Sequence, residues 1–108
     1  MAGAKLVVIY PRPHDEAAFE QAYKDIHMPM AEDKLKGMNR FVATKVISSP
    51  QGEPRTYRIA EAHFSSMDAL KACLETDGAK QVVQHAESIS TGGKPIVLIC
   101  EEETLLYW

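Results

Sequence analysis

The sequence predicts an α+β domain of the ferredoxin-like class. The expected element order is βαββαβ, with helices covering one face of a four-stranded antiparallel sheet. Three observations predict this fold. Runs rich in β-branched residues alternate with helical repeats of apolar residues. Turn residues separate the second and third of these runs. A length of 108 residues suffices for one hydrophobic core but not two, so we expect a single domain over residues 1–108.

The first half of the chain predicts a strand, a helix and a second strand. Residues 6–10 are apolar and β-rich, and Pro11 ends the run. Asp15 can cap a helix that Gly37 is placed to end. The apolar residues that recur at helical spacing are Ala18, Phe19, Ala22, Tyr23, Ile26 and Met30. Residues 41–47 predict the second strand.

The second half predicts a hairpin, an interrupted helix and a last strand. Residues 49–54 have turn chemistry, so residues 56–64 form the third strand and pair with the second. Ser65 or Ser66 can cap the next helix, which carries Met67, Leu70 and Leu74 on one face. Residues 76–78 interrupt this helix, and its pattern resumes as far as Ile89. The last strand covers residues 96–100.

The first and last strands are apolar on both faces, which predicts a homodimer. A sheet with one face in water alternates apolar and polar residues, but residues 6–10 and 96–100 do not alternate. A second copy of the chain is the simplest cover for a face that includes Leu6, Val8 and Leu98. Central strands with little exposed area are the alternative. We also expect the apolar tail, residues 104–108, to pack on its own domain or on the partner.

Composition argues against several classes of protein. The net charge of −3 and the absence of a basic patch make nucleic acid a poor partner. No apolar run approaches the roughly 20 residues that span a membrane. Residues 1–5 lack a signal-peptide pattern, so we expect a cytoplasmic protein. Cys73 and Cys100 are interpreted as small apolar core residues rather than a disulfide or a metal site.

Three stretches of sequence are specific enough to compare with known families: residues 8–13 (VIYPRP), 19–31 (FEQAYKDIHMPMA) and 57–70 (YRIAEAHFSSMDAL). Together they resemble the EthD family, which is named for a protein linked to ethyl tert-butyl ether degradation. The most specific motif is His27-x-Pro29 near the end of the first helix, preceded by Tyr23. The resemblance covers about residues 5–103 and implies a dimeric α+β barrel. That superfamily includes cofactor-free monooxygenases, lactone isomerases, polyketide cyclases, dehydratases and haem-degrading enzymes, so the substrate stays open.

His27 is the best candidate for a catalytic acid or base. Pro29 cannot donate a hydrogen bond to the carbonyl four residues back, so the helix should kink or end beside His27. Such an opening can direct an imidazole into a cavity, where it can act near neutral pH. The alternative is a helix-end histidine bonded to a backbone carbonyl. Tyr10, at the end of the first strand, could orient a substrate carbonyl or phenolate, and Tyr23 could form a pocket wall; simple packing is the alternative for both.

The third strand supplies the remaining candidate residues. Alternation places Tyr57, Ile59, Glu61 and His63 on one face, and Arg58, Ala60, Ala62 and Phe64 on the face toward the helices. Glu61 could then join His27 and Tyr10 in catalysis, while Tyr57 and His63 contact the substrate. A solvated face is the alternative. Although His27, Glu61 and His63 match the ligand types of a non-haem iron site, we expect neither a metal nor a cofactor. His14 and His85 are expected at the surface.

These features predict a homodimer that binds a small hydrophobic molecule in a barrel pocket. It could be a cofactor-independent enzyme of the isomerase, cyclase, dehydratase or monooxygenase type, with His27 as acid or base. A non-catalytic accessory or binding protein of an oxidative degradation pathway is the main alternative. A structural dimer with a filled barrel is a third.

Overall fold

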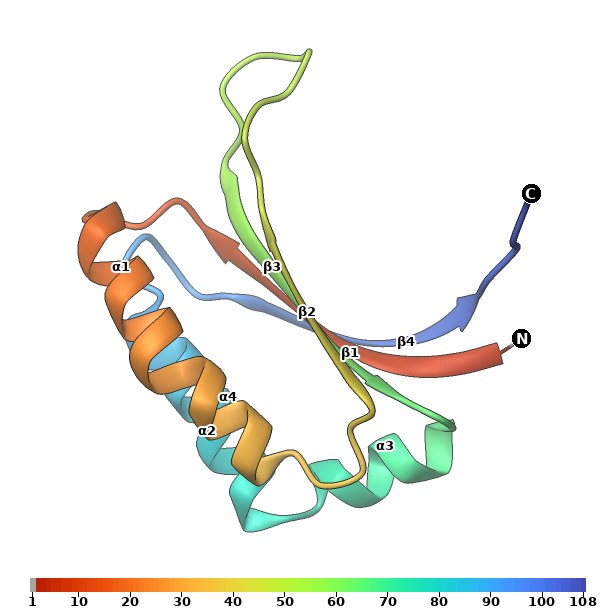
Figure 1. Ribbon diagram of the computed structural model, residues 1–108. Coiled ribbons are helices and arrows are strands. Elements are labelled where there is room, and N and C mark those ends of the chain that lie inside the picture. Colours follow the sequence, from red (N-terminus) through yellow and green to blue (C-terminus); the bar gives the residue numbers. More distant parts are fainter. Residues whose placement is uncertain (1) are drawn as a thin grey trace.

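The computed structural model describes residues 2–108; Met1, the first residue of the expected domain, lies outside the described residues. The described residues form a four-stranded antiparallel sheet in the order β2-β3-β1-β4, with the helices on one face (Figure 1). The strands are β1 (Ala2–Pro11), β2 (Arg40–Lys45), β3 (Thr56–Phe64) and β4 (Ile96–Glu103). The helical elements are α1 (Glu16–Ala22), η1 (Tyr23–His27), α2 (Met28–Lys34), α3 (Met67–Leu74) and α4 (Asp77–Ile89). The predicted fold class is confirmed.

The first helix is irregular beside His27, as the sequence predicts. It begins at Asp15, whose carboxylate accepts a hydrogen bond from the Ala18 N–H at 3.0 Å. Elements α1, η1 and α2 then follow without a break, and η1 is a π-helical turn in which the Met28 N–H bonds to the carbonyl of Tyr23. Pro29 lies directly after this turn and lacks the N–H that a regular helix would use. The helix therefore widens at His27 but does not end there.

The break in the second helical region is a capped turn. Ser66 caps α3, and Thr76 caps α4 by accepting a hydrogen bond from the Ala79 N–H at 3.1 Å. Gly78, in the first turn of α4, allows a close approach to the end of α2. A Cβ atom there would lie 3.2 Å from both the Cβ and the carbonyl oxygen of Lys34. This contact fixes how α4 lies beside α2 over the sheet.

The strand register corrects the predicted dimer face. Leu6 pairs with Ile99 and Val7 with Leu98. Directly paired residues of an antiparallel ladder point to the same side. Leu6 and Val8 are buried beneath the helices, whereas Leu98 is half exposed on the other face. The prediction that Leu6, Val8 and Leu98 share one open face is therefore wrong. Leu98 shares its face with Val7, whereas Leu6 and Val8 point toward the helices.

A β-bulge corrects the predicted orientation of Tyr57. Tyr10 pairs with Arg58, but Pro11 pairs with Thr56, so Tyr57 is the extra residue in β3. Its ring packs edge-to-face on Phe19 of α1 at a centroid distance of 5.6 Å. Tyr57 and Arg58 therefore both face the helices, and Tyr57 does not share a face with Glu61. Strict alternation cannot locate a bulge, which is why the sequence pattern misplaced this side chain.

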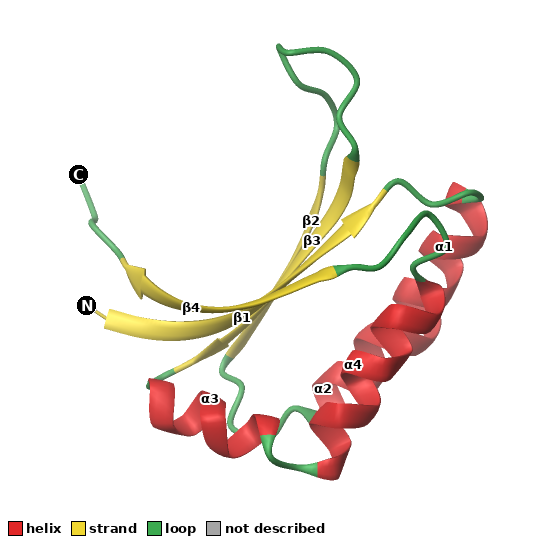
Figure 2. Cartoon of the chain, turned by 180° about the vertical axis from the view of Figure 1, so that it is seen from behind, coloured by secondary structure: helices red, strands yellow, loops and turns green. Residues whose placement is uncertain are grey.

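One face of the sheet and the C-terminal tail lack a cover within the described chain. Figure 2 shows helices on one side of the sheet only, and the tail leading away from the end of β4. On the uncovered face Ile96 and Leu98 of β4 are 54% and 44% exposed, and the tail residues 105–108 are 71–102% exposed. Packing of the tail on its own domain, one of the two predicted outcomes, is therefore wrong; packing on a partner stays a prediction.

None of the described helices is long and apolar enough to cross a membrane. The cytoplasmic location stays a prediction. Both cysteines are free thiols: Cys73 is buried in the core, as predicted, while Cys100 is only half-buried.

Candidate functional site

His27 is buried between the helices and the sheet. Its side chain is 3% exposed, and its Nε2 lies 3.3 Å from the hydroxyl oxygen of the fully buried Tyr10. The ring of Tyr23 stacks on the His27 imidazole at a centroid distance of 5.7 Å and an interplanar angle of 19°. Tyr23 and His27 lie four residues apart in the π-turn, and both are buried on the inner side of the helix. Three of the predicted site residues are therefore in contact.

His85 is a site residue that the sequence interpretation missed. Its Nδ1 lies 2.9 Å from the Nδ1 of His27, and the two imidazole planes differ by only 13°. His85 is half-buried on α4 rather than a free surface residue. The spacing of His85 in the sequence could have revealed its position. It follows the buried Val82 by three residues and precedes the buried Ala86, so it lies at the margin of the inner face of α4.

The site favours the uncharged forms of its ionisable groups. Burial, with a smaller contribution from the neighbouring His85, lowers the pKa of His27 to about 4. Burial likewise raises the pKa of Tyr10, and it raises the pKa of Tyr23 to about 12. A neutral imidazole has one donor and one acceptor nitrogen. At neutral pH His27 can therefore serve Tyr10 with one nitrogen and His85 with the other.

A buried ion pair closes one side of this aromatic cluster. The Arg58 guanidinium donates to both carboxylate oxygens of Glu20, at 2.6 and 3.0 Å, and lies 5.1 Å from the centre of the Tyr23 ring. The hydrogen bond from Arg58 holds the pKa of Glu20 below its usual range. Within residues 2–108, the buried hydroxyl of Tyr23 has no hydrogen-bond partner. It is thus a buried polar group whose hydrogen-bonding capacity the described residues leave unused.

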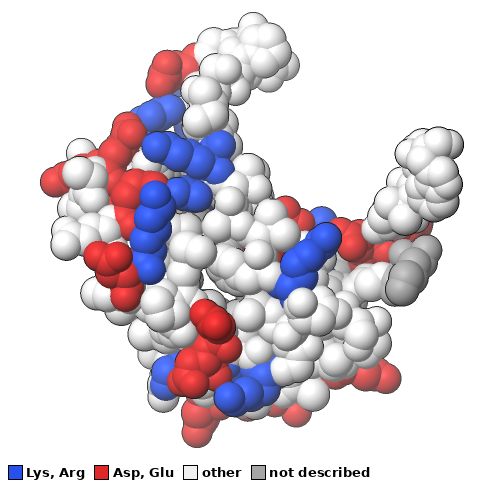
Figure 3. Space-filling model, in the orientation of Figure 1, with Lys and Arg blue, Asp and Glu red and all other residues white. Residues whose placement is uncertain are grey.

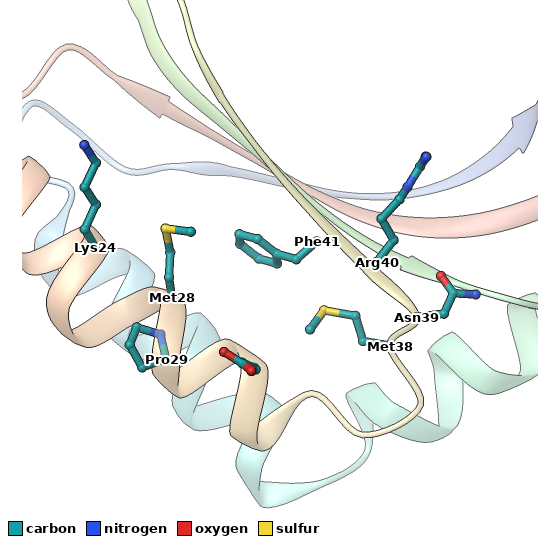
Figure 4. Close-up of a pocket in the computed structure, with 8 residues that line it drawn as sticks. Lys24, Met28, Pro29, Met38, Asn39, Arg40 and Phe41 are labelled. Carbon is teal, nitrogen blue, oxygen red and sulfur yellow. The ribbon is translucent and has the colours of Figure 1, made fainter.

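A groove with a volume of about 560 Å³ lies between the first helix and β2, a size that suits a small ligand. It is lined by Lys24, Met28, Pro29, Glu32, Met38, Asn39, Arg40 and Phe41. In Figure 4 Met28, Met38 and Phe41 lie around the space, with Lys24 and Arg40 farther out. Figure 3 shows a hollow on this side of the molecule, with charged side chains around it.

His27 does not line this groove. Met28, the next residue in the chain, lines the groove and also packs against the cluster that contains Tyr10 and Tyr23. Met28 therefore links the wall of the groove to the aromatic cluster. Methionine is unbranched and flexible, so this side chain can move at low energetic cost.

Glu61 and His63 lie on the opposite face of the sheet, so the predicted convergence of Glu61 with His27 is wrong. Alternation along β3 directs them away from the helices, as the sequence predicts for the strand itself. There the Lys5 ammonium lies 2.8 Å from Glu61 and 3.3 Å from Glu102, and Nε2 of His63 lies 3.4 Å from Glu61. The error was to assume that His27 reached this face, whereas its helix covers the other one.

The Glu61, His63 and Glu102 side chains have the donor types of a divalent-cation site, and their ligand atoms lie within 4.8 Å of one another. Lys5 already supplies a positive charge between the two carboxylates. Its hydrogen bond to Glu61 raises the pKa of Lys5, and its bond to Glu102 lowers the pKa of that carboxyl. The arrangement is therefore explained by ion pairing, and the expected absence of a metal stays a prediction.

His63 also lines a second hollow, of about 650 Å³, at the end of the sheet. One wall is formed by Leu105 and Leu106 of the exposed tail, so the shape of this hollow depends on where the tail lies. The two predicted substrate contacts on β3 thus separate: Tyr57 lies in the aromatic cluster and His63 lies on the open face.

The fold and the buried histidine cluster define an α+β protein of the ferredoxin-like class. Residues 12–88 match the family model of the EthD domain, and the chain belongs to the EthD family. An EthD family protein from Bacillus halodurans of known crystal structure is 27% identical, with a TM-score of 0.86 over 94% of this chain and 99% of that one. An uncharacterised 11.0 kDa protein encoded between thcB and thcC in Rhodococcus erythropolis is 26% identical over 94% of this chain and 97% of its own length. The resemblance stated from the motifs is confirmed.

More distant structures share the fold alone. A dimeric ferredoxin-like protein of unknown function from Jannaschia is 16% identical, with a TM-score of 0.65 over 94% of this chain and all of that one. The cofactor-independent oxygenase SnoaB from Streptomyces nogalater is 9% identical, with a TM-score of 0.62 over 98% of this chain and 95% of that one. The fold is thus one on which cofactor-independent oxygenases occur.

Proposed function

We propose that this protein binds a small, largely apolar molecule in the groove and transforms it by acid–base chemistry at His27, without a cofactor. The observation that carries the proposal is the buried hydrogen bond between Tyr10 and His27, whose neighbour in the chain, Met28, lines the groove. The lowered pKa leaves the His27 imidazole uncharged at neutral pH, which is the protonation state that a general base needs. The fold shared with a cofactor-independent oxygenase supports this class of chemistry.

The groove suits a molecule with a flat apolar body and a polar group. Met28, Met38 and Phe41 provide flexible and aromatic apolar surface, while Lys24 and Arg40 provide positive charge at the rim. Displacing Met28 would bring such a molecule to the Tyr10–His27 pair. Loss of a proton next to a carbonyl would leave an enolate, which can isomerise, cyclise, eliminate water or react with oxygen.

A second candidate function is non-catalytic binding, as in an accessory protein of an oxidative degradation pathway such as ether degradation. The observation that favours it is that His27 does not line the groove. In this case the histidine cluster only stabilises the fold, and the groove holds a metabolite. The two functions predict different effects of removing His27.

The experiment measures binding and proton transfer separately. Binding is followed with anilinonaphthalene sulfonate, a fluorescent apolar sulfonate, and proton transfer by exchange of the acidic protons of β-tetralone in deuterated water. Phe41→Ala should weaken probe binding. His27→Gln should leave probe binding intact and slow exchange by about 10²–10⁴-fold. His14→Gln, at an exposed histidine, is the matched control. Exchange that is unaffected by His27→Gln would eliminate the catalytic function and leave the binding function.

We further propose that the protein is a homodimer that buries the open face of the sheet and the tail, forming an α+β barrel. The exposed apolar residues of β4 and of the tail support it, because a monomer would leave this surface in water. The likeness to a dimeric ferredoxin-like protein gives further support. Light scattering at micromolar concentration should give twice the chain mass of 12.0 kDa.

A further inference from the structure

We propose that His85 is a positioning residue that relays protons between His27 and solvent. The inference rests on the proposed function of His27 as an acid or base. It assigns a role to a residue on α4, far from His27 in the sequence, that touches neither the groove nor Tyr10 according to the described contacts.

The geometry is that of a continuous hydrogen-bonded chain. Tyr10 Oη lies 3.3 Å from Nε2 of His27, and Nδ1 of His27 lies 2.9 Å from Nδ1 of His85. The two imidazole rings are 13° from parallel with centroids 5.1 Å apart. With facing nitrogens this close, the rings lie nearly edge to edge in one plane, which is the arrangement in which one nitrogen donates its proton to the other. Two neutral histidines therefore share one proton between their Nδ1 atoms.

The shared proton fixes the tautomers. If Nδ1 of His27 carries the proton and donates it to His85, then Nε2 of His27 is an acceptor that receives the Tyr10 hydroxyl proton. His85 then carries its own proton on Nε2. This is the state in which His27 is ready to act as a base toward the Tyr10 side.

Proton transfer through the pair leaves no charge on either histidine, and the negative charge stays on the enolate of the substrate. When a C–H bond of the substrate breaks, its electron pair stays on carbon as an enolate and its proton forms an N–H bond at Nε2 of His27, directly or through the Tyr10 hydroxyl. The Nδ1–H bond of His27 breaks as its proton joins Nδ1 of His85, and the Nε2 proton of His85 leaves to water. Both histidines end neutral in their other tautomers, and the reverse transfer resets them.

The surroundings of His27 explain why an exit for the proton is needed. The groups that face it are Tyr10 from β1, Tyr23 from η1 and His85 from α4, and none of these is an anion. The nearest described ion pair, Arg58 with Glu20, stacks on Tyr23 and is internally neutralised. A positive charge held on His27 would therefore be unpaired in a buried site, which is costly. Half-buried His85 is the group that connects this site to solvent.

The test has an arm without substrate and an arm with the β-tetralone probe. In nitrogen-15 spectra of the wild-type imidazoles at neutral pH, we expect Nδ1 of His27 to carry a proton that it shares with Nδ1 of His85. In His85→Ala the pKa of His27 should rise, because a like-charged neighbour is removed. Spectra in which Nδ1 of His27 shares no proton with Nδ1 of His85 would overturn the relay whether or not the protein is an enzyme.

In the exchange arm, His85→Ala should slow exchange by about tenfold or more while KM changes little, because His85 acts on proton transfer rather than on binding. Added imidazole should restore the rate in His85→Ala and have no effect on the His14→Ala control. A rate in His85→Ala equal to that of the wild type, with His27→Gln inactive, overturns the relay but keeps the proposed function. If wild-type protein and His27→Gln give the same exchange rate, the proposed function fails. The nitrogen-15 spectra then remain the test of the hydrogen bond between His27 and His85.

Discussion

Arg58 of β3 holds Glu20 of α1 through two hydrogen bonds of 2.6 and 3.0 Å. The pair ties the sheet to the first helix beside the π-turn, and the guanidinium also covers one face of the Tyr23 ring. Arg58 reaches Glu20 because alternation along β3 directs it toward the helices, and the bulge adds Tyr57 to the same face. The ion pair thus supports the side of the cluster from which His27 projects.

Arg58→Met should destabilise the protein by about 2–3 kcal/mol, because the Glu20 carboxylate would lose a buried partner. Urea unfolding measures the change. Glu20→Gln together with Arg58→Met should recover part of the loss, since no uncompensated charge is then left. Equal stability of the single and double variants would show that the pair contributes no net coupling.

Stability should fall as the pH is lowered through the range where His27 titrates. The folded-state pKa of His27 is about 4, below its ordinary value of 6.5. The unfolded chain therefore binds one more proton than the folded chain between these two values. The free energy of unfolding should drop by about 2–3 kcal/mol over this interval, at roughly 1.4 kcal/mol per pH unit. Glu20, whose pKa is lowered, adds a loss at still lower pH.

The variant His27→Gln separates the two contributions. It should flatten the stability profile between about pH 4 and pH 6.5 and keep the loss below that range, which belongs to the carboxylate. Chemical unfolding at a series of pH values measures this. A wild-type profile that is flat over the interval would mean that His27 is not held neutral by the fold.

Most of the fold is predictable from local patterns in the sequence. The bounds of β3, the caps at Asp15 and Ser66, and the irregular turn before Pro29 follow from residue types at fixed spacings. The contact of Tyr10 with His27 also followed, because the family motif marked one residue and the end of a strand marked the other.

The remainder of the site depends on features that no local pattern specifies. The bulge at Tyr57 depends on the register of β1 against β3, and the approach of His85 to His27 depends on how α4 lies beside the π-turn. Glu61 was assigned to the site wrongly. Its face of β3 was predicted correctly, but His27 was expected on that same side of the sheet and lies on the other side. Tertiary arrangement, rather than secondary structure, therefore limited the prediction of the site.

Leu98→Asp should separate the proposed dimer. Leu98 lies in the middle of β4 on the open face and is 44% exposed in the single chain. A carboxylate there would be buried without a partner in the interface, which is strongly unfavourable. Light scattering should then give the chain mass of 12.0 kDa. Ile26→Asp, at a similarly exposed apolar residue on the helical side, should stay dimeric.

Removal of the tail residues 104–108 tests where the tail packs. Within a single chain Leu105, Leu106, Tyr107 and Trp108 are largely exposed, so their loss costs a monomer almost no buried area. If the tail packs on the partner, several large side chains lose about 1.5–3 kcal/mol of burial each, offset by roughly 1–2 kcal/mol per residue of regained backbone freedom.

The truncated protein should therefore dissociate at a higher concentration than the full chain, and its melting temperature should depend more steeply on concentration. Combining the truncation with Leu98→Asp provides the control, because a chain that is already monomeric should lose no further stability with its tail. Unchanged dimerisation in the truncated protein would show that the tail lies outside the interface. A further loss of stability in the monomeric variant would instead place the tail on its own domain.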